Sequence, residues 1–84
     1  MIEGMNKAKI CVAVGAGMFS SERAVSFRVN GTTYNLVVDP SDISESNMLS
    51  VLVIQREQDE SIVDLPRETF TTGNRIRVPT SLLR

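Results

Sequence analysis

The chain has 84 residues, of which 42% are hydrophobic and 23% are charged, and its formal net charge is −1. A chain of this length forms one domain with a modest core, and this composition is typical of a globular protein rather than a disordered one. The absence of histidine and the single cysteine exclude a Ser-His-Asp triad and a zinc site built from thiolates. We therefore expect a protein that is not an enzyme and that needs no cofactor or metal.

The beginning of the chain predicts an arm followed by a strand. Its first residues show no apolar pattern, so we expect a disordered arm over residues 1–7 and a single β-rich domain over residues 8–84. Ala8 to Val14 alternates, with Ile10, Val12 and Val14 on one side and Lys9, Cys11 and Ala13 on the other, which predicts a strand with Cys11 buried as a small apolar side chain. Gly15 and Gly17 are expected to end or bend this strand.

These glycines, with Asp39 downstream, imitate part of a dinucleotide-binding fingerprint. The third glycine position is Ser20, however, and residues 21–30 have the period of a strand rather than a helix. The interpretation as a glycine bend between two strands is therefore preferred, and no cofactor is expected.

A β-hairpin centred on Asn30-Gly31 is the firmest local prediction, because a type I′ turn needs positive φ at both central residues. A two-residue loop sets the register. It places Val29 opposite Thr32 and Phe27 opposite Tyr34, and it puts four residues on one apolar face: Val25, Phe27, Tyr34 and Leu36.

The rest of the chain predicts further short strands separated by turns. Asp39 to Asp42 forms a turn with a capping side chain, and one helical turn is expected over residues 43–47. Met48 to Gln55 is apolar on both faces, as in a central strand, and Ser61 to Leu65 returns as its hairpin partner. Pro66 is expected to end that strand, with Phe70 tucked under the sheet. Arg75 to Val78 is an edge strand, and Leu82 and Leu83 are expected to close the core.

Strands at this spacing predict an all-β fold. We expect a small single-domain antiparallel barrel, SH3-like or OB-like, or a two-layer sandwich, with five to six short strands and at most one helical turn. No apolar run approaches the roughly 20 residues that cross a membrane. The lone cysteine fits a reducing compartment, so we expect a cytoplasmic protein with no membrane partner.

The charges are unevenly distributed along the chain. From Asp39 to Asp64, seven acidic residues stand against Arg56 alone, a net charge of −6, and from Leu65 to Arg84, four arginines stand against Glu68, a net charge of +3. Solvated faces explain such segregation most simply. An alternative is a polyanion-binding face made of four residues: Arg28, Arg67, Arg75 and Arg77.

Two classes of function follow from these observations. The first is a non-catalytic interaction or assembly module, which acts as a homo-oligomer or with a protein partner. The second is a nucleic-acid-binding barrel that uses the arginines named above. The sequence pI of about 5.3 and the expected burial of Phe27 and Tyr34 favour assembly, because nucleic-acid binders of this size usually have a basic surface and exposed aromatic side chains.

Overall fold

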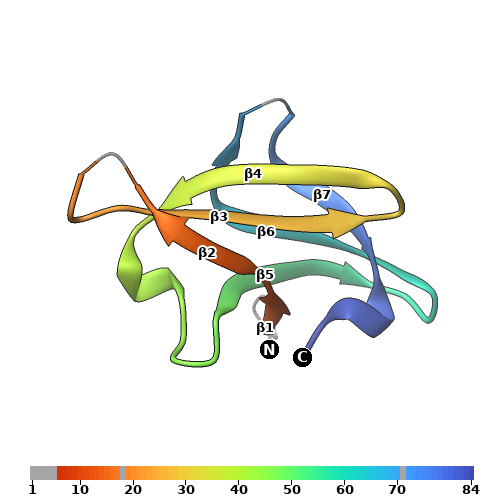
Figure 1. Cartoon of the computed structure of the whole chain (residues 1–84). Coiled ribbons are helices and arrows are strands. Elements are labelled where there is room, and N and C mark those ends of the chain that lie inside the picture. Colours follow the sequence, from red (N-terminus) through yellow and green to blue (C-terminus); the bar gives the residue numbers. More distant parts are fainter. Residues whose placement is uncertain (1–5, 18, 71) are drawn as a thin grey trace.

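The computed structural model describes residues 6–17, 19–70 and 72–84. Its described part is all-β, as predicted, with seven strands in two antiparallel sheets. The four-stranded sheet has the order β1-β5-β6-β7 and the three-stranded sheet has the order β2-β3-β4. Figure 1 shows β3 and β4 lying across β5 and β6 as a second layer. The strand bounds are β1 Asn6–Cys11, β2 Ala13–Ala16, β3 Arg23–Val29, β4 Thr32–Val38, β5 Met48–Arg56, β6 Glu60–Thr69 and β7 Gly73–Pro79.

The prediction of five to six strands was too low, because the first predicted strand bends and serves both sheets. The bend lies at Val12, whose amide donates to the Asn47 carbonyl at 3.0 Å, rather than at the glycines. Residues before Val12 pair with β5 and residues after it pair with β3. Cys11 is exposed, so its predicted burial was wrong. Residues 6 and 7 of the predicted arm lie in β1, and residues 1–5 of that arm lie outside the described residues.

The predicted hairpin is confirmed as β3 and β4. Asn30 and Gly31 have φ values of 49° and 86°, as a type I′ turn requires. The register pairs Val29 with Thr32 and Phe27 with Tyr34, as expected. The two aromatic rings stack with centroids 5.4 Å apart, on the side of the sheet that faces the core.

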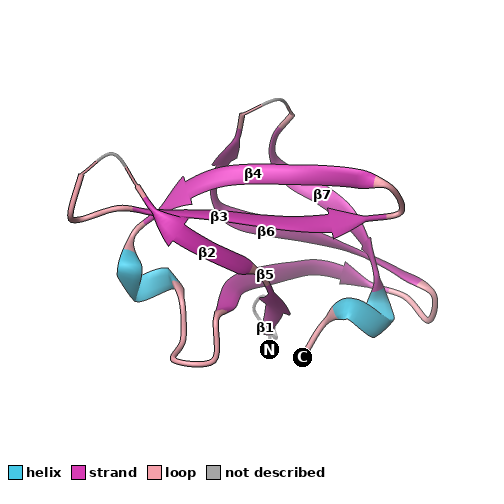
Figure 2. Cartoon of the chain, viewed as in Figure 1, coloured by secondary structure: helices cyan, strands magenta, loops and turns pink. Residues whose placement is uncertain are grey.

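The structure has two short 3-10 turns, η1 (Pro40–Asp42) and η2 (Thr80–Leu82), where at most one helical turn was expected (Figure 2). The helical turn expected over residues 43–47 was wrong, because η1 ends at Asp42 and those residues form a bridge and a turn instead. η1 lies within the turn predicted at Asp39 to Asp42, where the Asp39 carboxylate accepts from the Ser41 amide and the Asp42 carboxylate accepts from the Asp39 amide. η2 is held by the Thr80 hydroxyl, which donates to the Glu57 carbonyl at 2.6 Å.

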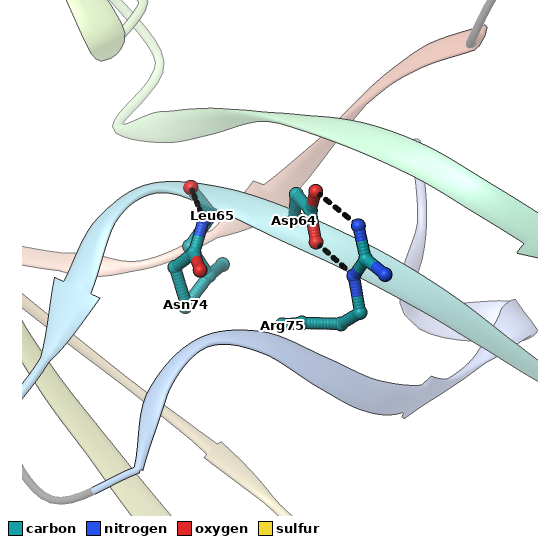
Figure 3. Close-up of polar contacts among 4 residues, drawn as sticks. All are labelled: Asp64, Leu65, Asn74 and Arg75. Atoms are coloured by element: carbon teal, nitrogen blue, oxygen red, sulfur yellow. Dashed lines mark hydrogen bonds and ion pairs between the residues drawn. The ribbon is translucent and has the colours of Figure 1, made fainter.

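Strand β6 continues through Pro66 to Thr69, so the expected end at Pro66 was wrong. A proline is tolerated there because the ladder with β7 is already interrupted between Asp64 and Thr69. The Asn74 side-chain amide donates to the Leu65 carbonyl at 3.2 Å across this irregularity (Figure 3). Phe70 is 71% exposed, not tucked under the sheet.

The core lies between the two sheets and receives side chains from both. From its start to Val53, every second residue of β5 faces the core: Leu49, Val51 and Val53. Leu83 is buried and Leu82 packs against the core, as predicted.

The described residues form no closed barrel, so the closed-barrel alternative was wrong. Beyond Asp64, β6 no longer pairs with β5, and its ladder with β7 is interrupted until the pair Thr69–Gly73. Its far end approaches β4 through the hydrogen bond from the Phe70 amide to the Asn35 carbonyl, at 3.0 Å, without forming a ladder.

Candidate functional site

The strongest candidate for a functional surface is the side of the four-stranded sheet that points away from the core, called here the outer face. Strand alternation places side chains there from all four strands. The residues between the buried positions supply it: Lys7, Lys9, Ser50, Leu52, Ile54, Ile62, Asp64, Arg75 and Arg77.

Three large apolar side chains occupy the centre of the outer face. Leu52, Ile54 and Ile62 are half-buried, yet they belong neither to the core nor to the residues that pack against it. A bulge at Ile54 lets the β5 ladder pass from the pair Val53–Val63 to the pair Gln55–Ile62. This strand was predicted to be apolar on both faces. One set of its apolar side chains lies in the core and the other set lies on the surface.

Charged side chains flank this apolar centre. The register forms one row across the sheet, in which Lys7 lies opposite Leu52, Leu52 opposite Asp64, and Asp64 opposite Arg75. Within the row, the Arg75 guanidinium donates from Nε and Nη2 to the two Asp64 oxygens at 2.7 and 3.0 Å (Figure 3). These hydrogen bonds hold the pKa of Asp64 below its ordinary value of 3.8 and raise the pKa of Arg75.

A second ion pair joins the same two strands. Arg77 Nη1 lies 3.5 Å from Glu60 Oε1, and both side chains are largely exposed. The acidic and basic segments of the sequence thus meet as neighbouring strands, β6 and β7. Part of the uneven charge distribution therefore reflects ion pairs between these two strands. This agrees with the expectation that the segregated charges lie on solvated faces.

The four predicted polyanion-binding arginines do not share one surface. Arg75 and Arg77 lie together on β7, each beside an acidic residue. Arg28 is exposed on β3, in the other sheet. Arg67 is exposed near the end of β6, and its charge helps to lower the pKa of Asp39, after the larger effect of the Ser41 hydrogen bonds. Polyanion binding by these residues stays a prediction.

Two aromatic side chains are exposed on the surface, and the sequence did not predict this exposure. Phe19 is 64% exposed in the β2–β3 connection and Phe70 is 71% exposed in the β6–β7 connection. Figure 1 shows the two connections apart from each other. No periodic pattern in the sequence marks a single aromatic residue in a turn as exposed, so neither could have been identified from the chain alone.

A shallow cavity of about 260 Å³ opens on the outer face, and Lys7, Asp42, Leu52 and Asp64 contribute to its lining. Asp42 comes from η1, so the cap of that turn positions a second carboxylate near the row. Among residues 6–17, 19–70 and 72–84, no group of three or more acidic, cysteine or histidine side chains is arranged to hold a metal ion. None of the helical segments in this part of the chain is long and apolar enough to cross a membrane.

No protein-family model, curated protein or solved structure matches the chain. The functional argument therefore rests on the geometry of the outer face.

Proposed function

We propose that this protein is a non-catalytic assembly module that forms a homodimer through the outer face of its four-stranded sheet. The observation that carries the proposal is the position of Leu52, Ile54 and Ile62, which are half-buried on a face directed away from the core. Contiguous apolar area on the surface of a soluble protein usually marks an interaction site.

The energetics favour a weak, reversible association. Complete burial of a leucine or isoleucine side chain contributes about 1.5–3 kcal/mol, and these three side chains are already half-buried in one chain. The remaining gain has to offset the loss of translational and rotational freedom on association. We therefore expect an equilibrium between one and two chains that shifts with concentration.

A homodimer fits this face better than a polyanion does. The two cations of β7 that such a ligand would contact each lie beside a carboxylate, Asp64 or Glu60. A phosphate chain bound here would compete with both ion pairs, and its own negative charges would lie close to the two carboxylates. Nucleic-acid binding remains the alternative prediction, together with a different protein partner.

Sedimentation equilibrium of the full chain, from micromolar to millimolar concentration, tests the proposal. The average mass should rise from one chain toward two, as mass action requires. Leu52→Glu should keep the mass at one chain over most of this range, because it places a carboxylate in the centre of the outer face.

Val37→Glu is the matched control. Val37 is also half-buried and lies within a strand between two buried residues, but it belongs to β4 of the other sheet. This variant should associate as the parent does. A parent mass of one chain at every concentration would remove the proposal, and equal effects of the two substitutions would remove the outer face as its site.

A further inference from the structure

The charges in the central row of the outer face have opposite signs on the two sides of β5. Leu52 stands at the middle of β5, with the Lys7 ammonium on one neighbouring strand and the Asp64 carboxylate on the other. Such a row is complementary to its own copy after a two-fold rotation about an axis that runs along the central strand.

We propose that two copies pack face to face with a two-fold axis along β5, so that Lys7 of each copy pairs with Asp64 of the other. This inference rests on the proposed homodimer and deepens it by specifying its geometry. Leu52 of one copy then meets Leu52 of the second, and each symmetric contact occurs twice. The strands of the two sheets stay nearly aligned, which is a common geometry for sheets that pack face to face.

Other two-fold arrangements of the same face bring unfavourable contacts. An axis across the strands, along the row itself, would place Lys7 on Lys7 and Asp64 on Asp64. An axis along β6 would again oppose the two Asp64 carboxylates. An axis between β5 and β6 would press Leu52 against Asp64 and bury the carboxylate against an apolar side chain, which is costly. The charge pattern therefore selects the axis along β5.

The Asp64 carboxylate has the capacity for this second partner. Its two oxygens each accept one hydrogen bond from Arg75, and an ionised carboxylate can accept about four. Its side chain is 20% exposed, so it is reachable from outside. Arg75 holds the carboxylate ionised and oriented, while the longer lysine reaches across from the facing sheet. Face-to-face sheets lie roughly 10 Å apart, a gap that a lysine side chain from one sheet and an aspartate side chain from the other can bridge together.

A charge-reversal experiment in two full-length variants tests this geometry. Lys7→Glu alone should weaken the homodimer roughly tenfold, because two repulsive pairs replace two attractive ones. Asp64→Lys alone should weaken it similarly. Mixed in equal amounts, the two variants should form a one-to-one heterodimer of near-parental affinity, because both cross-pairs then join opposite charges. Sedimentation equilibrium measures all three affinities, and circular dichroism checks that each variant is folded.

Lys9→Glu is the matched control for the first variant. Lys9 lies two residues further along β1 on the same face, opposite Ser50 rather than in the charged row. It should change the affinity far less than Lys7→Glu does. If Asp64→Lys fails to fold beside Arg75, the comparison of Lys7→Glu with Lys9→Glu decides the question alone.

Three results would overturn the geometry. Equal effects of Lys7→Glu and Lys9→Glu would reject the axis along β5, and so would folded charge-reversed variants that do not associate on mixing. In both cases a parent chain that still dimerises would leave the proposed homodimer standing. A parent that is a single chain at all concentrations would reject both.

Discussion

At the scale of single residues, the turn at Asn30 and Gly31 determines the β3–β4 register. Gly31 has a φ of 86° with no heavy atom within 4 Å of the position that a Cβ would take, so the demand for glycine comes from the backbone alone. Gly31→Val should therefore lower the free energy of unfolding by about 1–2 kcal/mol. Urea denaturation measures this, with Asn30→Gly as a nearly neutral control. Equal stability of Gly31→Val and the parent would contradict this account of the turn.

Phe27 shows how much one core side chain contributes. It is 7% exposed and stacks against Tyr34. Phe27→Ala removes most of its buried area and leaves a cavity, so the free energy of unfolding should fall by about 3–5 kcal/mol, a large part of the total for a small domain. Thermal and urea unfolding would reveal the loss. A variant as stable as the parent would mean that this ring is not part of the core.

At the scale of elements, the ion pair between β6 and β7 predicts a pH dependence. The pKa of Asp64 lies below 3.8 in the folded chain, mainly because Arg75 donates hydrogen bonds to it. Its contribution to stability is therefore present above pH 3.8 and is lost as the pH falls through the lowered folded-state pKa. Asp64→Asn should lose less stability than the parent between neutral pH and about pH 3. The effect is small, because the Arg75 side chain is 62% exposed and solvent screens its attraction to the carboxylate.

Urea titrations at the two pH values, in dilute solution where the proposed homodimer would dissociate, provide this measurement. The pKa of Asp39 is also lowered. The free energy of unfolding of both proteins should therefore still fall somewhat at acidic pH. An identical loss of stability in Asp64→Asn and the parent would show that the pair does not stabilise the fold.

Elements defined by local chemistry were predictable, and elements defined by contacts distant in sequence were not. The Asn30-Gly31 turn carries its own conformational demand, so the hairpin, its register and its buried face followed from the chain. The bend at Val12 arises because the strand pairs with β5 before it and with β3 after it, and neither pairing is visible locally. Pro66 ends a strand only where its missing amide is needed, and the interrupted ladder beyond Asp64 removes that need.

At the scale of the whole molecule, the candidate surface was partly predictable. An apolar pattern on both faces of Met48 to Gln55 indicated that both faces need a cover, from the same chain or from a second copy. The row that joins Lys7, Leu52 and Asp64 could not be predicted, because it depends on the register of β1 against β5 and on the bulge at Ile54. The positions of the four arginines could not be predicted either, because they depend on which strands join which sheet rather than on the spacing of the arginines in the sequence.

The central claim is that two copies of this chain meet through the outer face of the four-stranded sheet. A dilution series of methyl NMR spectra, from millimolar to micromolar concentration, tests both the association and its location. The signals of Leu52, Ile54 and Ile62 should shift with concentration, while those of Ala24 and Val37 on the other sheet should stay in place. Spectra that do not change with concentration, or shifts confined to Ala24 and Val37, would contradict the claim.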